Sequence, residues 1–171
     1  MTPPAAPGVA EGSRLCLACG LCCQGLLHTR ARLRDDEAGA ARRLGLPLLA
    51  AEPGNTAFSL PCPRYQENRC AIYEERPSPC GGYECGVLQR YLRGETTFAA
   101  SLAIVQRAQE LAASLRRRMG GGEPGRRIWD QLAPLLGNGG DEQIQLETAA
   151  LLVLCRKHFD STGELGEVLL P

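Results

Sequence analysis

At 171 residues, the chain is long enough for one domain, or one domain with an extension, and for a sizeable hydrophobic core. It carries 19 basic and 19 acidic residues, so no net charge favours nucleic acid or an anionic membrane as a partner. Nine residues are cysteines, and eight of them lie in two blocks between residues 16 and 85.

The N-terminal residues 1–13 are predicted to be a short disordered arm. The first eight residues, MTPPAAPG, lack the basic start and the apolar stretch of a secretory signal. No run of about 18 apolar residues indicates a membrane span. We therefore expect a cytoplasmic protein, in a reducing compartment where clustered cysteines are more typical of metal sites or catalytic thiols than of disulfides.

The first block contains Cys16, Cys19, Cys22 and Cys23 in the spacing C-x-x-C-x-x-C-C. Its glycine and cysteine content predicts an irregular segment. A C-x-x-C loop directs two thiolates at one ion, and a third cysteine at the same spacing extends the site; the bacterial ferredoxin run opens in the same way. Because successive side chains diverge, Cys23 is expected to serve a second metal centre, to bridge, or to remain a free thiol.

Short elements are predicted between the two blocks. Residues 26–33 and 57–60 resemble short strands, and a helix is expected from Asp35 or Asp36 to about Leu44, ended by Gly45. Residues 47–56 form a predicted loop.

The second block contains Cys62, Cys70, Cys80 and Cys85. Cys62 and Cys70 are predicted to flank a tight reversal of the chain. Pro79 suits the first position of a helix, so Cys80 would lie in the first turn of a helix that continues through Cys85 to Gly94. That position is expected to favour the Cys80 thiolate.

The C-terminal part is predicted to be helical over about 97–119, 125–136 and from Asp141 onward, because its apolar residues recur at steps of three and four. Cys155 falls on the apolar stripe of the last helix and is interpreted as a core residue. The predicted fold class is α+β: a small, irregular, cysteine-rich metal-binding half with short strands and helices (14–93), followed by a three-helix C-terminal region (94–171) that packs on it.

The eight blocked cysteines suit two four-thiolate sites or one polynuclear cluster. The metal is expected to be an iron–sulfur cluster or zinc, with iron slightly preferred. His28 is interpreted as a strand or surface residue, because the cysteines already suffice as ligands. Tyr73 and Tyr83 are expected to cover the metal, and Arg76 to bind nearby carbonyls or to offset the charge of the thiolates.

The pattern Cys16-x-x-Cys19-Gly-x-Cys22-Cys23, then Leu60-Pro-Cys62-Pro, then Cys70-x-Ile-Tyr-x-x-Arg-Pro-x-x-Cys80-x-x-x-x-Cys85, resembles the YkgJ-type CxxCxxCC proteins, a zinc- or iron-chelating family. The resemblance covers about residues 14 to 93. It implies that all eight cysteines bind metal, in a cytoplasmic, mostly bacterial protein. Some relatives join this domain to flagellin lysine methylation, where an iron–sulfur cluster is implicated, but this sequence has no glycine-rich nucleotide loop after a strand.

Two hypotheses for the function follow. In the first, the metal centre serves electron transfer, metal handling or a protein-modifying enzyme. In the second, zinc is purely structural and the helical tail is a surface for a protein partner, without catalysis. A thiol oxidoreductase using Cys22 and Cys23 is a weaker third hypothesis, because adjacent cysteines form only a strained disulfide. No residue is predicted to be catalytic, and the arginines near residues 116–127 suit a helix end better than nucleic acid.

Overall fold

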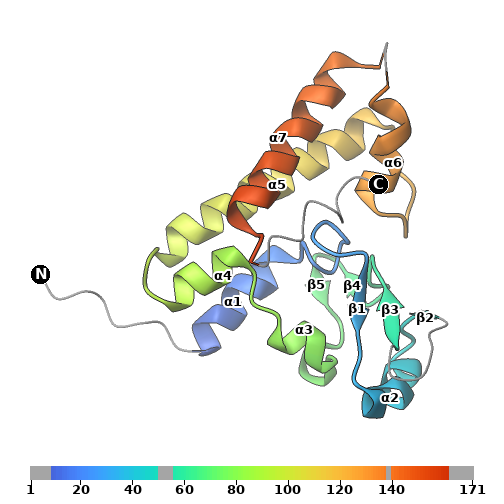
Figure 1. The fold of residues 1–171 in the computed structure, drawn as a ribbon, viewed down its shortest axis with the longest axis vertical. Coiled ribbons are helices and arrows are strands. Elements are labelled where there is room, and N and C mark those ends of the chain that lie inside the picture. Colours follow the sequence, from blue (N-terminus) through green and yellow to red (C-terminus); the bar gives the residue numbers. More distant parts are fainter. Residues whose placement is uncertain (1–8, 50–55, 138–139, 162–171) are drawn as a thin grey trace, which may run out of the picture.

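The computed structural model describes residues 9–49, 56–137 and 140–161. Within these ranges the predicted α+β class is confirmed: seven α-helices and five short strands form two small sheets and a helical C-terminal region (Figure 1). None of the helices in these ranges combines the length and the hydrophobicity needed to cross a membrane.

The chain begins with helix α1 (Val9–Cys19), which carries the first two cysteines. The predicted irregular segment is therefore wrong at Cys16 and Cys19, and residues 9–13 of the predicted arm are helical; residues 1–8 lie outside the described part. Leu15 is buried and Cys19, one turn later, packs on the same core, so tertiary packing supports the helix. Gly20, with φ +63°, ends it.

A three-stranded antiparallel sheet follows, in the order β1-β3-β2, from β1 (Arg30–Arg32), β2 (Leu48–Leu49) and β3 (Ala57–Ser59). Strands β1 and β3 lie within the two predicted strands, whereas β2 falls in the predicted loop. Between β1 and β2, a 3₁₀ turn and helix α2 (Ala38–Arg43) form the predicted helix, which stops before Gly45. These elements enclose a small core made of Leu33, Ala41, Leu46, Phe58 and Leu60.

The second block begins with a hairpin of β4 (Tyr65–Gln66) and β5 (Arg69–Cys70). Glu67 and Asn68 both have positive φ, as a two-residue hairpin turn requires, so the predicted reversal is confirmed. Helices α3 (Ser78–Gly82) and α4 (Gly86–Leu92) follow, with extended backbone at Tyr83 and Cys85. The single helix predicted from Pro79 to Gly94 is therefore wrong: Gly81 and Gly82 weaken it, and the amide of Gly86 donates to Phe159 O instead (2.9 Å).

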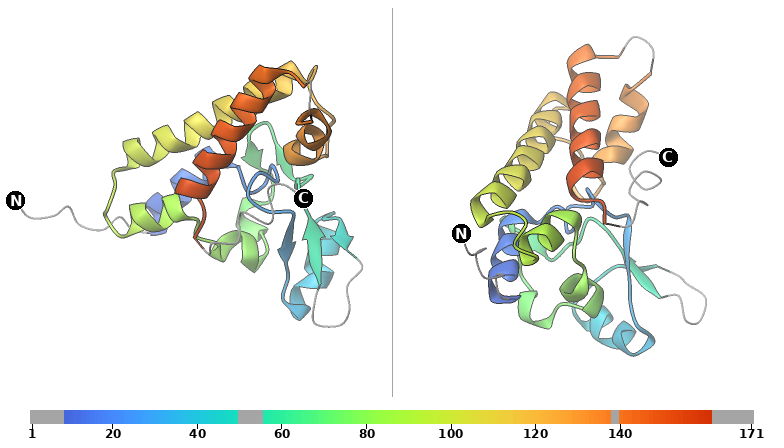
Figure 2. Two further views of the ribbon diagram at one scale, coloured as in Figure 1. Left: turned by 45° about the horizontal axis from the view of Figure 1, so that its top comes forward. Right: turned by 60° about the vertical axis from the view of Figure 1, so that its left-hand side comes forward.

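The C-terminal region contains α5 (Phe98–Arg118), α6 (Ile128–Leu132) with a 3₁₀ turn after it, and α7 (Glu142–His158). Side chains of Thr97 and Asp141 accept hydrogen bonds from the amides of Ala100 and Ile144, which fixes the starts of α5 and α7. Helix α7 lies along α5 in both views of Figure 2. The three predicted helices are thus present.

One large core joins the C-terminal helices to the cysteine-rich part. Leu15 of α1 and Leu21, Leu26 and Leu27 of the following loop are buried with residues of α4, α5, α6 and α7. Trp129 is the largest fully buried side chain. The division of the chain between residues 93 and 94 remains a prediction, and this core extends across it.

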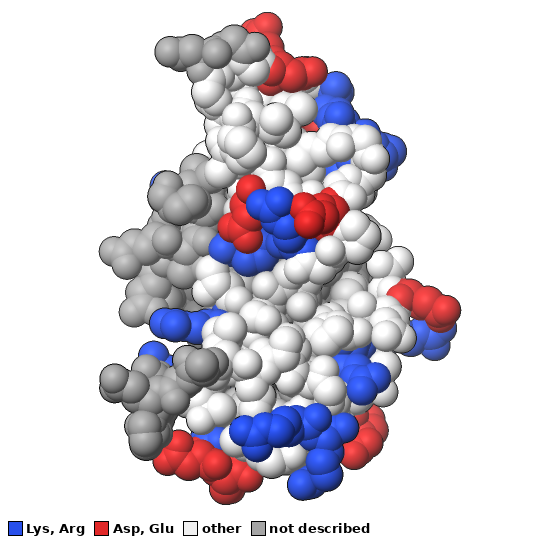
Figure 3. All heavy atoms as spheres, turned by 90° about the vertical axis from the view of Figure 1, so that its right-hand side faces the viewer, with Lys and Arg blue, Asp and Glu red and all other residues white. Residues whose placement is uncertain are grey.

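The charged side chains form local groups of both signs on the face drawn in Figure 3. Three of the arginines between residues 116 and 127 form ion pairs: Arg118 lies 3.1 Å from Glu147, Arg126 lies 2.7 Å from Glu123, and Arg127 lies 3.3 Å from Asp130. These arginines are therefore engaged within the fold.

Candidate metal site

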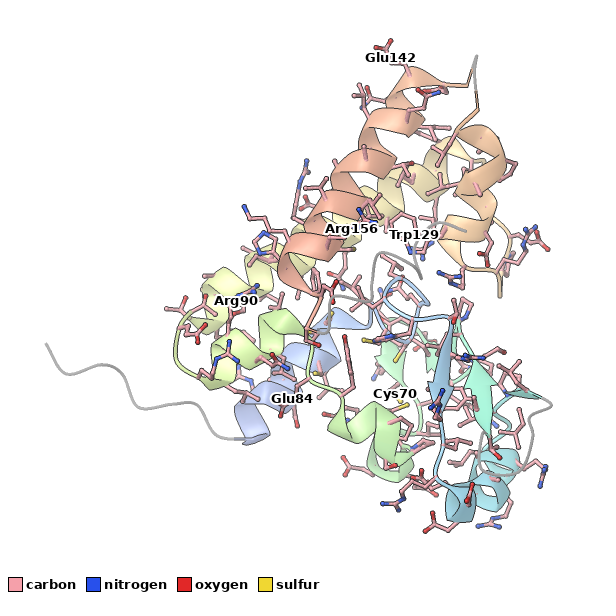
Figure 4. The ribbon with its side chains drawn as sticks, viewed as in Figure 1. Cys70, Glu84, Arg90, Trp129, Glu142 and Arg156 are labelled. Atoms are coloured by element: carbon pink, nitrogen blue, oxygen red, sulfur yellow. The ribbon has the colours of Figure 1, made fainter. Side chains whose placement is uncertain are left out.

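A cavity of about 290 Å³ is lined by all eight cysteines of the two blocks. In Figure 4, sulfur atoms gather between α1, α3 and the β4–β5 hairpin, where Cys70 is labelled. Cys16 and Cys80 are exposed, and the other six are partly buried. The two blocks are thus brought to one place, as the sequence predicted.

The cysteines are positioned by several different local structures. Cys16 and Cys19 lie one turn apart on α1, and Cys22 and Cys23 lie in the turns that follow it. The amide of Cys62 donates to Cys23 O (2.7 Å), which joins the blocks directly. Cys70 ends β5, Cys80 lies in α3 and Cys85 is the N-cap of α4.

The strongest electrostatic interactions sort the eight thiols into two groups of four, and weaker ones join Cys23 to Cys16, Cys19 and Cys22 as well. After burial, the main influences that raise the pKa of Cys22 are Cys19 and Cys85, and Cys85 also raises that of Cys16 and Cys19. The pKa of Cys23 is raised by burial and then by Cys62, Cys70 and Cys80. Cys70 also raises the pKa of Cys62, and Cys62 and Cys70 both raise that of Cys80. The first group is Cys16, Cys19, Cys22 and Cys85; the second group is Cys23, Cys62, Cys70 and Cys80.

Desolvation keeps these thiols protonated when no cation is near. Burial raises the pKa of Cys16 and Cys80 from 9.0 to about 11, and that of Cys23 to about 12. The expectation that a helix start favours the Cys80 thiolate is wrong, because α3 has only five residues and desolvation outweighs its field. A bound metal cation would stabilise all the thiolates together.

The eight cysteine donors suit a metal–sulfur group by their chemistry. Four sulfurs on one zinc ion would lie about 3.8 Å apart. Among the residues that the structure describes, no three Cys, His, Asp or Glu side chains are gathered closely enough to hold an ion as they stand. All eight cysteines line one cavity, and their thiols would have to turn toward a bound group.

Two buried polar atoms also suit such a group. His28 Nε2 and Tyr73 Oη are buried without a hydrogen-bond partner in the described part of the chain, and both residues line the cavity. Metal-bound sulfur accepts hydrogen bonds, and such bonds tune a cluster. The interpretation of His28 as a surface residue is thus wrong, since it lines the cavity and its ring contacts the Tyr83 ring edge-on (4.5 Å).

Arg76 lines the cavity and is partly buried. Its guanidinium stacks on the Tyr73 ring, 3.6 Å from the ring centre. Its charge partly offsets the rise in the pKa of both Cys16 and Cys80. Its position agrees with the expected role of offsetting thiolate charge.

A family model matches residues 15–98 of this chain. The family is CxxCxxCC, with the description "Putative zinc- or iron-chelating domain". Residues 15–98 therefore match the CxxCxxCC domain. The match contains all eight cysteines and reaches the first residue of α5, and chelation of zinc or iron is the function that the family description gives to this domain. Comparison with curated proteins and comparison with solved structures each gave no match.

Helices outside the CxxCxxCC domain hold its first cysteine loop in place. Gln109 Nε2 donates to the carbonyls of Ala18 (3.0 Å) and Cys19 (2.7 Å), and Trp129 Nε1 donates to that of Leu26 (2.8 Å). Arg127 Nε donates to Gly25 O (3.2 Å). These donors lie 90 to 103 residues after their acceptors, and nothing in their local sequence indicates the contact.

The sequence also gave no indication of the role of Tyr65. The Tyr65 hydroxyl group lies directly against Gly20, so a side chain at position 20 would overlap it. Tyr65 also lines the cavity. The tight turn between Cys19 and Cys22 therefore needs glycine for space as well as for its positive φ.

Proposed function

We propose that the CxxCxxCC domain binds metal at two four-sulfur centres, one in each cysteine group. The observation that carries this proposal is the division of the thiols into two groups of four around one cavity. Four thiolates are the usual ligand set of a structural zinc ion and of an iron–sulfur cluster. Cys22 and Cys23 fall into different groups, which agrees with the divergence of successive side chains.

Iron–sulfur centres are the better supported choice of metal. In a cluster the cysteines bind different iron ions, so their sulfurs lie farther apart than around one zinc ion. The cavity of about 290 Å³, lined by all eight cysteines, favours the larger group. Such a cluster supplies one-electron chemistry; the chain's residues would bind it, shield it from water and donate hydrogen bonds to its sulfurs.

In this proposal the protein works in electron transfer, in metal handling or in support of a protein-modifying enzyme. A reducing compartment such as the cytoplasm would keep its thiols available. The second candidate is a structural zinc module, which is favoured by a specific observation. The cysteines come from α1, the hairpin, α3 and α4, and several of these elements are only two to five residues long, so ligation would join otherwise weak elements.

The test is purification without oxygen, followed by a visible spectrum and by measurement of iron, zinc and acid-labile sulfide per chain. A brown protein with iron and sulfide supports iron–sulfur centres. A colourless protein with about two zinc ions per chain supports the structural alternative. A folded protein that contains neither metal, even after reconstitution, would overturn both.

The two-centre arrangement is tested by Cys85→Ala and Cys80→Ala, which each remove one ligand from a different group. Each change is expected to lower the metal content by about half, and the double variant to abolish it. Cys155→Ala is the matched control, because Cys155 is buried in the helical core. Complete loss of metal from either single variant, with the fold retained by circular dichroism, would indicate one polynuclear centre instead.

A further inference from the structure

Helix α7 has an apolar face that no other described element covers. Its inner face buries Ile144, Thr148, Leu151 and Cys155. On the opposite side, Leu146 is 59% exposed and Val153 is 62% exposed, more than any other large hydrophobic side chain in the described ranges. In Figure 1 this helix lies in front of α5, on the outside of the molecule.

The exposed residues follow the spacing of a helix-pairing seam. Glu142, Leu146, Ala149 and Val153 recur at steps of four, three and four, and all four are exposed. Lys157, four residues after Val153, is exposed on the same face. The alanine at the middle of the seam would let a second helix approach closely.

The same face is complementary to itself when one copy is turned end to end. Rotation about the point between Ala149 and Ala150 places Leu146 opposite Val153 and Glu142 opposite Lys157. An isologous two-fold contact needs this kind of self-matching surface. In a parallel pairing, Glu142 would face Glu142 of the other copy and Lys157 would face Lys157. This repulsion between like charges favours the antiparallel arrangement.

We propose that the exposed face of α7 binds the same face of a second copy of this chain, as an antiparallel two-fold helix pair. The apolar middle of the seam provides the contact, and the acidic and basic ends fix its direction. The proposal is independent of the metal. Figure 4 labels Glu142 at the far end of α7, where it is free of the bulk of the CxxCxxCC domain.

The size of the seam sets the strength of the dimer. Helix α7 has 17 residues and is about 26 Å long. A pair of such helices buries less than the roughly 1,200 Å² of a stable complex. The dimer is therefore expected to be reversible, with a dissociation constant in the micromolar range.

The experiment is sedimentation velocity on the full, metal-loaded chain under reducing, oxygen-free conditions, from about 1 µM to about 1 mM. The mass is expected to rise from one chain to two. Val153→Glu is expected to weaken association at least 10-fold. Leu146→Glu is expected to have the same effect, and it replaces Val153→Glu as the test if that variant folds poorly. Ala103→Glu adds the same charge on an exposed position of α5 and is expected to change nothing.

Charge reversal tests the direction of the pair. Glu142→Lys places two positive charges opposite each other and is expected to weaken the dimer; adding Lys157→Glu in the same chain restores it only in the antiparallel arrangement. A chain that stays monomeric throughout would overturn the proposal and leave the face to another partner. A dimer unaffected by Val153→Glu and Leu146→Glu, or not rescued by the double reversal, would also overturn it.

Discussion

Gly86, directly after Cys85, is a residue at which metal binding and the helical core meet. A Cβ atom at Gly86 would lie 2.7 Å from His158 O and 3.0 Å from Asp160 O, which are both backbone atoms and cannot turn away. The end of α7 therefore packs against the backbone that holds Cys85.

Gly86→Ala is expected to destabilise the protein by about 1–3 kcal/mol, because the new methyl group forces the two segments apart. It should also lower metal retention in the first group by moving Cys85. Thermal unfolding and metal analysis check both effects. The control is Gly82→Ala, where a Cβ meets nothing within 4 Å; equal losses in the two variants would contradict this explanation.

Cys155 shows the opposite behaviour to the eight blocked cysteines. It is fully buried on α7, and burial raises the pKa of its thiol to about 12. In the metal-free, folded protein near pH 8, we expect iodoacetamide to modify exposed Cys16 and Cys80 first and Cys155 only after unfolding. Mass spectrometry of timed samples measures the order, and early modification of Cys155 would show that the core opens locally.

At the scale of the elements, Trp129 links α6 to the first cysteine loop. Trp129→Phe removes the hydrogen bond to Leu26 O and leaves a buried carbonyl unpaired, so we expect a loss of about 1–3 kcal/mol. Denaturant unfolding followed by circular dichroism measures it. The control is Leu135→Ala, at a partly exposed position nearby, which is expected to change stability by less than about 0.5 kcal/mol. A similar loss of stability in the two variants would contradict a specific role for the hydrogen bond between Trp129 and Leu26.

The helices that could be predicted from sequence are those with local signals. Caps at Thr97 and Asp141, together with apolar periodicity, define α5 and α7 without knowledge of the rest of the chain. Helix α1 was not predicted, because Leu15 and Cys19 need the distant α4 and α5 to form their packed face. The break between α3 and α4 has a local signal in Gly81 and Gly82, but it also depends on the hydrogen bond from Gly86 to the distant Phe159, which no local pattern could reveal.

The candidate site shows the same limit. The spacing of the eight cysteines alone predicted that they form one set of metal ligands. In the structure all eight line one cavity, which agrees with that prediction. Their division into two groups could not be predicted, because it pairs Cys85 with the first block and Cys23 with the second. The donors Gln109, Arg127 and Trp129 were missed because their local sequence resembles that of any amphipathic helix.

At the scale of the whole molecule, the metal-free and metal-loaded forms should respond to pH in opposite ways. In the metal-free fold, the pKa values of Cys16, Cys23 and Cys80 lie at about 11 to 12, above the 9.0 of an unfolded thiol. Their contribution to stability is therefore complete below about pH 9 and is lost as the pH rises to about 12. Metal ligation requires thiolates, so the loaded form should lose metal and stability as the pH falls.

Thermal unfolding under reducing conditions across this pH range, with and without chelator, checks the contrast. The alkaline loss should disappear when metal is bound, because the bound thiolates are already deprotonated. A metal-free form that gains stability above pH 9 would show that the thiols are not desolvated as the structure indicates.

Each cysteine group has one exposed residue, Cys16 in the first and Cys80 in the second, and the charge of Arg76 acts on both thiols. The two centres would thus share a single solvent-facing side that carries a positive charge. Electrons would enter and leave there most readily, and superoxide, being an anion, would be drawn to the same place. A redox partner that covers Arg76 with acidic residues would then both exchange electrons with the centres and protect them from air.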